Sequence, residues 1–431
     1  MISSYDNNDK YRDIDEVEKT KSISVTDIID TITAILLIVS SNTLYGRIGK
    51  ASQLIRLSIL FLELFVIASH WCRKGLSKQT IWKWLLWCLA FIVSYVATCF
   101  AYGVSGGLGN LCFFAIAMLS PLYVYVMIRM GRWRAVCRKF SLIMIALAIF
   151  SMILWIFGSL LGIIKSNCTI ETNWTPMGNT IRLNGYYHLL YEYQYRITLG
   201  KSIVRNTGIF VEGPMYSFSL CVAAMFVWLY ENRSFRQIAL PVLFATIIST
   251  QSTTGILFIL VFICLNIINT NDRKSAIRIL LIPIVIIVVV LSIYMVSSEK
   301  LQSGIASTRV DDFIAGYNAW LHSPIFGNGF DLSSFIHTYT SGFRANDLGF
   351  SNSIMAVLAT GGLLFAIPYL LGFAGFFISN NMAKRFAGVL YLLIWTITIV
   401  YRLPLAMILL GWGYCSQLDD DDYESRAETS R

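Results

Sequence analysis

The sequence predicts an all-α fold, a polytopic bundle of about twelve transmembrane helices with both termini in the cytosol and two large outer loops. Of the residues, 56% are hydrophobic and 14% are charged, whereas a soluble domain carries about 25% charged residues. The apolar residues form runs long enough to cross a membrane as helices, which satisfy their own backbone hydrogen bonds in lipid. Runs such as LLIPIVIIVVVLSIYMV do not alternate as the strands of a membrane barrel would.

The apolar runs divide the chain into successive predicted spans within one integral membrane domain, residues 27–414. We expect spans near Ile28–Leu44, Leu54–Trp71, Trp82–Tyr102, Leu111–Met130, Ser141–Ile164, Met215–Tyr230, Ile238–Thr250, Gly255–Ile268, Ile277–Val296, Asn352–Phe377, Phe386–Tyr401 and Leu403–Tyr414. The last two share one apolar stretch broken at Arg402–Leu403–Pro404, so one span fewer also fits. A polar tail at 1–26, without the pattern of a cleavable signal, and an acidic tail at 415–431 are expected in the cytosol.

Basic residues collect between alternate spans, which sets the predicted orientation. The predicted inner loops hold Arg73, Lys74, Lys78, Lys83, Arg129, Arg132, Arg134, Arg138, Lys139, Arg233, Arg236, Arg273, Lys274, Arg278, Lys384 and Arg385. The short outer loops hold little basic charge, apart from Arg47 and Lys50 in the first of them. Membrane topology therefore explains the formal net charge of +9, and we expect no nucleic-acid partner.

The first large outer loop, residues 165–214, combines tyrosines with basic residues. Its members include Arg182, Tyr186, Tyr187, Tyr191, Tyr193, Tyr195, Arg196 and Arg205. A tyrosine ring suits the face of a sugar and equally suits the membrane interface, so both interpretations stay open. Glu212 lies just before the sixth span, where partial desolvation would raise the pKa of a carboxylate and suit a general base. Alternatively, Glu212 only stabilises the start of the following helix, because a negative charge there interacts favourably with the helix dipole.

The second large outer loop, residues 298–351, contains an amphipathic helical pattern that Pro324 ends. Thr308 and Asp311 fit a capping box, which would place Arg309 in the first helical turn. A helix N-terminus with an arginine suits a diphosphate, although Asp311 and Asp312 count against it. Carboxylates and a diphosphate could instead share Mg²⁺. The loops lack a dense carboxylate cluster, so we expect no metal and no cofactor.

Two polar or flexible features lie inside the predicted spans. Arg56 and Glu63 in the second span either line a cavity or neutralise each other. Gly361–Gly362 in the tenth span most simply allows close helix packing. Cys168 is the one cysteine in a large outer loop, and no zinc-type cysteine spacing occurs.

Four segments resemble, in order and spacing, landmarks of the bacterial O-antigen polymerase and ligase superfamily, the Wzy type. They are NTGIFVEGPMYSFSL, IISTQSTTGILFILVF, STRVDDFIAGYNAWLHSPIFGNGF and SNSIMAVLATGGLLF, within residues 200–375. The most specific landmark comprises Arg309, Trp320, His322, Pro324, Gly327 and Gly329. The resemblance implies a metal-independent C-type glycosyltransferase at the outer face of the bacterial cytoplasmic membrane.

A polymerase of this superfamily joins undecaprenyl-diphosphate-linked oligosaccharide repeat units into an O-antigen, capsule or exopolysaccharide. The resemblance implies that outer-loop arginines hold the diphosphates and that an acid or a histidine activates the acceptor hydroxyl. On this basis Glu212, Arg309 and Arg205 are the catalytic candidates. Substrate binding is expected from Arg182, Arg196, Arg344, His322, Tyr191 and Tyr195, with His322 alternatively orienting its own turn. The implied partners are membrane lipids, a chain-length regulator and a flippase.

The sequence departs from the ligases of this superfamily at one position. Ligases typically carry a catalytic histidine just before the helix that follows the second large loop, where this chain has Ser351–Asn352–Ser353. This difference favours a polymerase, while a ligase stays possible if His337 folds back. A transporter or flippase of lipid-linked sugars is the alternative from another class, but it would favour internal repeats and charged or broken helices near the midplane.

Overall fold

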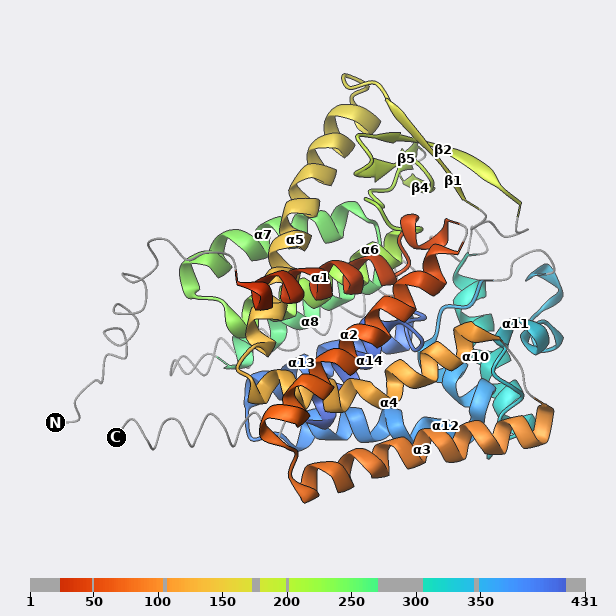
Figure 1. The fold of residues 1–431 in the computed structure, drawn as a ribbon. Coiled ribbons are helices and arrows are strands. Elements are labelled where there is room, and N and C mark those ends of the chain that lie inside the picture. The colour runs from red at the N-terminus through yellow and green to blue at the C-terminus, as the bar shows by residue number, and fades with distance from the viewer. Residues whose placement is uncertain are drawn as a thin grey trace.

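The computed structural model describes residues 24–48, 50–103, 107–172, 179–198, 201–269, 305–344 and 349–415, and they are mostly helical. The helices are α1 (Val25–Ser40), α2 (Ala51–Lys74), α3 (Lys78–Tyr102), α4 (Leu108–Arg129), α5 (Trp133–Leu154), α6 (Gly213–Tyr230), α7 (Arg233–Ser249), α8 (Thr253–Asn269), α10 (Ile305–His322), α11 (Leu332–Phe335), α12 (Ser353–Ile378), α13 (Met382–Ile397) and α14 (Pro404–Tyr414) (Figure 1). Every predicted span that falls on these residues coincides with a helix. The ninth predicted span, 277–296, lies outside them.

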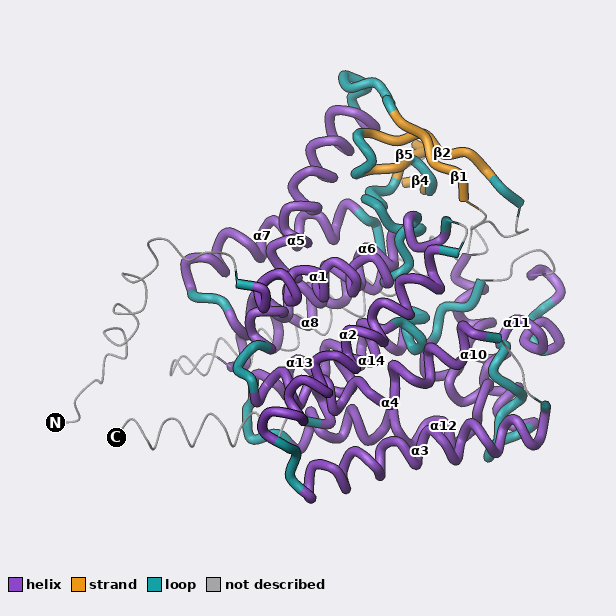
Figure 2. The backbone as a smooth tube through the Cα atoms, viewed as in Figure 1, coloured by secondary structure: helices purple, strands orange, loops and turns teal. Residues whose placement is uncertain are grey.

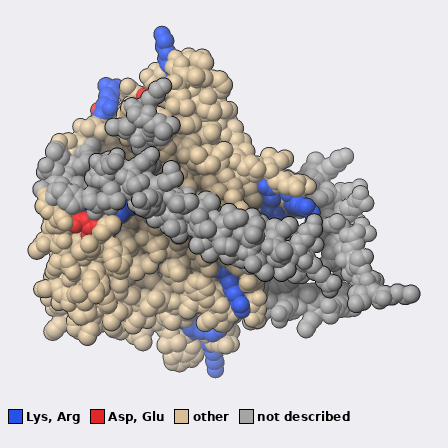
Figure 3. Space-filling view, turned by 180° about the vertical axis from the view of Figure 1, so that it is seen from behind, with Lys and Arg blue, Asp and Glu red and all other residues tan. Residues whose placement is uncertain are grey.

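Six of the described helices are long and apolar enough to cross a membrane. They are α2, α3, α4, α6, α12, and α5 extended by the π-helical segment Trp155–Leu160. On the face seen in Figure 3, most of the described residues are neither acidic nor basic. This apolar helical architecture is that of a polytopic membrane protein, while the number of spans and their orientation remain predictions.

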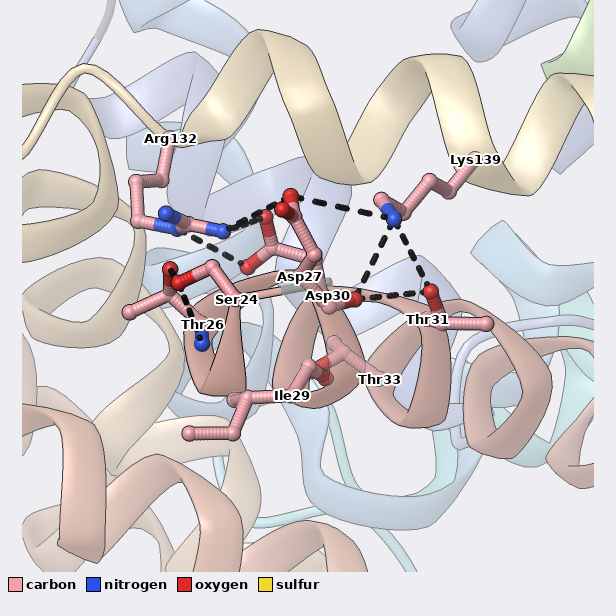
Figure 4. Close-up of polar contacts among 9 residues, drawn as sticks. All are labelled: Ser24, Thr26, Asp27, Ile29, Asp30, Thr31, Thr33, Arg132 and Lys139. Atoms are coloured by element: carbon pink, nitrogen blue, oxygen red, sulfur yellow. Dashed lines mark hydrogen bonds and ion pairs between the residues drawn. The ribbon is translucent and has the colours of Figure 1, made fainter. Parts of the chain in front are cut away.

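One end of the bundle gathers residues that the charge pattern places in the cytosol. Arg132, at the start of α5, donates to both carboxylate oxygens of Asp30 on α1, at 3.2 and 2.5 Å, and Lys139 donates to Thr31 at 3.0 Å (Figure 4). At the start of α3, the Lys83 carbonyl accepts a hydrogen bond of 2.9 Å from Tyr414 at the end of α14. Helix ends predicted to share one side of the membrane are therefore neighbours.

The other end gathers residues of the predicted outer side. The connection between α1 and α2 forms an antiparallel bridge from Thr43 to Phe210, and the amide of Leu44 donates to Ile209 at 2.9 Å. The segment before α6 is thus held against the first short outer loop. The helix contacts agree with the predicted inner and outer grouping at both ends.

The first large outer loop departs from the all-α expectation because it contains two small antiparallel sheets (Figure 2). One sheet has the order β1 (Cys168–Thr172), β2 (Ile181–Tyr186), β3 (Leu190–Tyr191), and the other pairs β4 (Tyr195–Thr198) with β5 (Lys201–Val204). Side chains along β2 alternate between exposed and buried positions before two buried residues end the strand. This period-two pattern covers too few residues to stand out in a tyrosine-rich loop, so the sequence did not predict the strands.

Glu63 and Arg56 do not neutralise each other. Glu63 is 1% exposed and accepts a hydrogen bond of 3.3 Å from Ser120 on α4, whereas Arg56 donates to the carbonyl of Gly109 at 3.1 Å. Glu63 lines a cavity of about 10 Å³ with residues that include Tyr123. A cavity of this size is about one water molecule wide. The ion-pair interpretation is therefore wrong, and the cavity interpretation holds for Glu63 but not for Arg56, which is not among the residues that line this cavity.

The turn that follows α10 is inserted into a break in α12. Gly362 has φ 63° and ψ −159°, so α12 consists of two helical pieces. The amide of Asn328 donates to the Ala359 carbonyl at 2.9 Å, and the amide of Leu363 donates to the Pro324 carbonyl at 2.8 Å. The glycine pair does not simply allow helix packing, as the sequence suggested. It opens the helix so that backbone groups of the turn can pair with it.

This break generates a prediction for Gly362→Ala. A Cβ at this position would overlap the carbonyl of Ile325, in a backbone conformation that only glycine readily adopts. We expect the free energy of unfolding to fall by roughly 2 kcal/mol or more, measured by thermal or denaturant unfolding in detergent.

Gly75→Ala is the matched control for this substitution. Gly75 has nearly the same backbone angles, φ 68° and ψ −179°, but a Cβ there would meet nothing within 4 Å. The control therefore carries the conformational strain without the overlap. Equal destabilisation by the two substitutions would contradict the proposed docking of the turn.

Candidate active site

The two large outer loops meet at one cavity of about 200 Å³. Its walls come from the start of α6, from α10, from the segment before α12 and from the end of α13: Glu212, Pro214, Met215, Thr308, Arg309, Asp312, Arg344, Gly349, Phe350, Ser351, Ile397, Thr398 and Ile399. The cavity brings together three predicted site residues, Glu212 from the first large outer loop and Arg309 and Arg344 from the second.

Glu212 is the residue that precedes the first turn of α6. Its backbone is extended, with φ −158° and ψ 157°, and Pro214 starts the helix behind it. Its side chain makes no capping hydrogen bond, so it is available to the cavity. Burial raises the pKa of Glu212 above its ordinary value of 4.5, although the charges of Arg205, Arg309 and Arg47 oppose that rise. A carboxylate of this kind suits a general base.

Arg205 is fixed beside Glu212 by backbone and amide groups. Its Nε donates to the Thr250 carbonyl at 2.8 Å, and its Nη1 donates to Oε1 of Gln194 at 3.0 Å. The same Gln194 oxygen accepts the amide of Gly213 at 3.2 Å. These contacts hold Arg205 next to the start of α6 and to Thr250, which follows α7.

Arg309 lies beyond the first turn of α10, because that helix begins at Ile305. The predicted capping box at Thr308 and Asp311 is therefore wrong, and the helix N-terminus does not add directly to an anion site at Arg309. Asp311 instead accepts hydrogen bonds from the backbone and hydroxyl of Ser341, at 3.1 and 2.5 Å. Arg309 reaches the cavity from the side of the helix.

Arg344 is only 2% exposed and is surrounded by protein acceptors. It pairs with Asp312, lies 3.6 Å from Asp311, and donates to the carbonyls of Thr308 and Gly349. Asp312 also accepts hydrogen bonds from the backbone and hydroxyl of Ser351, at 2.9 and 2.6 Å. Arg344 thereby interacts with both aspartates, and these contacts attach α10 to the segment before α12.

Several predicted substrate-binding residues do not line the cavity. Tyr191 is fully buried, and its hydroxyl lies 3.0 Å from both Tyr45 and His188, which favours packing over sugar stacking. The other members of this set are Arg182, bonded to Thr169, Tyr195, which is exposed on β4, and His322, bonded to Asn328. The backbone of Arg196 lies in β4, and its side chain is outside the described part of the structure.

His322 has the contact expected of a residue that orients its turn. Its Nδ1 lies 3.1 Å from Oδ1 of Asn328, whose Nδ2 donates to the carbonyls of Ala319 and Ala359. The most specific sequence landmark thus combines one cavity residue, Arg309, with a turn that anchors the helix carrying it.

Sequence reasoning missed Arg47, whose charge reaches the site although its side chain does not line the cavity. Arg47 donates to Oδ1 of Asn42 at 2.9 Å, and the Asn42 carbonyl accepts the amide of Val211 at 3.0 Å. Its charge acts on Glu212. The available signal was its position in a short outer loop, where basic residues are otherwise few.

Residues 238–370 match the family model described as O-antigen ligase, Wzy_C. Comparison with curated proteins and with solved structures gave no match. The match places this segment of the chain in the O-antigen polymerase and ligase superfamily. Members of the Wzy_C family are membrane glycosyltransferase-like enzymes. The matched segment contains Arg309, Asp312 and the turn at His322, whereas Arg205 and Glu212 precede it.

The buried contacts of Arg344 predict that Arg344→Ala destabilises the fold. Removing one partner of a buried ion pair leaves the other charge uncompensated and costs roughly 3 kcal/mol. We expect Asp312→Ala to have a similar effect on the unfolding free energy in detergent, and the double variant to lose less than the sum. Arg182→Ala, at an exposed position, is the control. Unchanged stability of Arg344→Ala would show that its role lies in binding alone.

Proposed function

We propose that the protein is a polysaccharide repeat-unit polymerase, an inverting and metal-independent glycosyltransferase that uses undecaprenyl-diphosphate-linked oligosaccharides. One observation carries the proposal. Glu212 from the first large outer loop and Arg309 from the second line the same cavity. A base and a cation around one space are what transfer of a glycosyl group from a diphosphate requires.

In the proposed reaction, Glu212 takes the proton of an acceptor hydroxyl as that oxygen attacks the anomeric carbon of the donor. The bond between this carbon and the lipid diphosphate breaks, and the diphosphate leaves with the electron pair. Arg309, supported by Arg205, stabilises the negative charge that grows on the leaving group. A single displacement from the opposite face inverts the configuration at the anomeric carbon.

The contacts just before α12 favour a polymerase over a ligase. Ser351 donates to Asp312, Asn352 caps α12 through its side chain, and Ser353 donates to the Thr398 carbonyl. No histidine is among the described residues that line the cavity. His337 lies exposed in a 3-10 turn, Ile336–Thr338, and is not a lining residue either.

The glycan phenotype of a deletion strain separates the candidate functions. A polymerase mutant should accumulate lipid-linked single repeats on the outer side of the membrane. A finished but unattached polymer would indicate a ligase, and repeats retained on the inner side would indicate a flippase.

Arg309→Ala should abolish polymer while the protein still inserts into the membrane. Loss of one charged hydrogen-bond donor to the transition state costs about 2.7–4 kcal/mol, or about 10²–10³ in rate. Chain-length ladders from a complemented deletion strain provide the measurement. A larger activity in Arg309→Lys than in Arg309→Ala would show that charge matters more than the fork geometry.

Arg138→Ala is the control for this arginine series. The Arg138 side chain is 64% exposed and pairs with Glu231 at the predicted inner end, at 3.3 Å. The Arg138→Ala variant should therefore give normal chain-length ladders. Normal ladders from Arg309→Ala would exclude the proposed role of Arg309.

The raised pKa of Glu212 predicts the acidic limb of the pH–rate profile. The base must be ionised, so the rate should fall as the pH drops through a pKa above 4.5. Initial rates of polymer formation by purified protein give the profile. The rate of Glu212→Gln should be lower by a factor of about 10²–10⁴, and its pH–rate profile should lack the acidic limb. A limb at or below pH 4.5 would contradict burial as the dominant effect on this carboxylate.

A further inference from the structure

The exposed side of α10 is apolar, although the sequence places this helix in an outer loop. Its large apolar residues are between 42 and 59% exposed: Val310, Phe313, Ile314, Tyr317 and Leu321. At 3.6 residues per turn they fall on one side of the helix, and the exposed polar residues Asn318 and His322 lie together along one edge of it. Ile325 and Phe326 in the following turn are exposed as well. We call these seven apolar residues the apolar face of α10.

The opposite side of α10 is polar or small, and it is the side that packs on the protein. Asp311 and Asp312 are buried there. Ala315 and Ala319 are fully buried and share a small cluster with Ala359 of α12. A helix on the surface of a soluble protein has the reverse distribution, with its apolar side on the core and its polar side in water.

The contacts of α10 with α12 place the second half of α10 beside the first turns of a helix long and apolar enough to span the membrane. A Cβ on Gly316 would overlap the side chain of Met355. Nδ2 of Asn328 donates to the carbonyls of both Ala319 and Ala359, at 2.6 and 3.0 Å. Ala359 lies about six residues after the start of α12, which is about 9 Å along the helix axis. The two helices therefore enter from the same end and run in the same direction.

The turn after α10 also meets α3, a second helix of spanning length. The carbonyl of Phe326 accepts a hydrogen bond of 3.1 Å from Oγ1 of Thr98. The ring of Phe330 stacks on that of Tyr95, with centroids 5.6 Å apart. A helix needs about 20 residues to cross the hydrocarbon core, and the uncharged run Trp84–Tyr102 has about this length. Thr98 and Tyr95 therefore belong to the part of α3 that crosses the core, and the turn lies level with them.

Irregular backbone at this depth needs protein partners, and the turn has them. The carbonyls of Pro324 and Ile325 accept the amides of Leu363 and Leu364 at the break in α12, at 2.8 and 3.3 Å. Non-helical backbone is tolerated inside a membrane where the protein pairs its polar groups. The break in α12 thus supplies the groups that this insertion requires, and the side chains of the apolar face remain on the outside.

The chain leaves at the end at which it enters. Beyond the turn and α11, Arg344 donates to the carbonyl of Thr308, near the start of α10, at 3.2 Å. Figure 1 shows α10 and α11 together at one end of the bundle, next to α12. The path from α10 to Arg344 therefore goes in and comes back without crossing the bundle.

We propose that α10 and the turn after it form a re-entrant element in the outer leaflet of the membrane, with the apolar face of α10 against lipid acyl chains. A large exposed apolar surface marks a contact with a membrane or with another protein. Acyl chains are the occupant that fits here, because the apolar face continues the exposed apolar sides of two helices of spanning length. Phe100, two residues after Thr98 on α3, is 94% exposed, and Leu363 on α12 is exposed beside Pro324.

This insertion fixes the height of the cavity relative to the bilayer. Thr308, Arg309 and Asp312 line the cavity from the side of α10 opposite to the apolar face. A helix held in the outer leaflet by one side therefore holds the cavity at the level of that leaflet. The proposal does not depend on the reaction proposed for the cavity.

The experiment detects lipid beside single positions of the full-length protein in nanodiscs of palmitoyl-oleoyl-phosphatidylcholine. Phe313→benzoylphenylalanine and Leu321→benzoylphenylalanine place a photoreactive group on the apolar face. Phe100→benzoylphenylalanine is the positive control on α3. On irradiation the ketone inserts into a neighbouring C–H bond, and mass spectrometry of the intact protein gives the fraction that has gained one lipid.

Tyr187→benzoylphenylalanine is the matched control, because Tyr187 is an aromatic residue of the first large outer loop and is 59% exposed. The lipid-bound fraction from the two α10 positions should be similar to that from Phe100. It should exceed that from Tyr187 by about tenfold or more, because acyl chains are confined to a core about 30 Å thick. Thermal unfolding verifies the fold of each variant, and Phe326→benzoylphenylalanine replaces any α10 variant that does not fold.

Two results would overturn the proposal. One is crosslinking of the α10 positions to another segment of the chain or to a second copy, without lipid adducts, because a protein would then cover the apolar face. The other is an equal lipid-bound fraction from Tyr187, because the contact would then not depend on insertion. Neither result would bear on the polymerase proposal, which the chain-length ladders of the Arg309 variants test separately.

Discussion

The pairing of the turn after α10 with the broken helix α12 is the constraint on which the site depends. An unbroken α12 would have no free backbone groups at Ala359 and Leu363, and the turn at Pro324–Asn328 would have no partner in the bundle. The paired Arg344 and Asp312 add a second attachment at the other end of α10. With both ends fixed, α10 presents Arg309 to a cavity whose opposite wall is the start of α6.

The distribution of positive charge follows from the same arrangement. An arginine near the bilayer must be matched by an acid, bonded to neutral acceptors, or kept for a ligand. Arg344 and Arg132 are matched by aspartates, and both act as attachments between segments. Arg205 and Arg56 donate to carbonyl and amide oxygens, which orient their guanidinium groups at the predicted outer end.

The sequence predicted the helices well because a spanning helix is specified locally, by length and hydropathy. It also singled out Glu212 and Arg309, from their chemistry and from the resemblance to a family, and the fold brings both to one cavity, while their roles stay predictions. The capping box failed because α10 already begins at Ile305, and Asp311 is engaged by Ser341, a contact across 30 residues that no local pattern contains. The break at Gly362 was hidden for the same reason, because it depends on a turn that only the fold brings near. The strands in the first outer loop were missed because each is short.

The electrostatics of Glu212 connect substrate binding with base strength. Burial raises the pKa of this carboxyl, and three arginines partly offset that rise. A diphosphate bound at Arg309 and Arg205 would cancel much of their charge, so the pKa of Glu212 would rise further when the donor is in place. The same interaction acts in reverse, because linkage is reciprocal: protonation of Glu212 would tighten diphosphate binding. The carboxylate would thus become its strongest as a base when the donor that it serves occupies the site, and departure of the free diphosphate would lower the pKa and favour release of the proton taken from the acceptor.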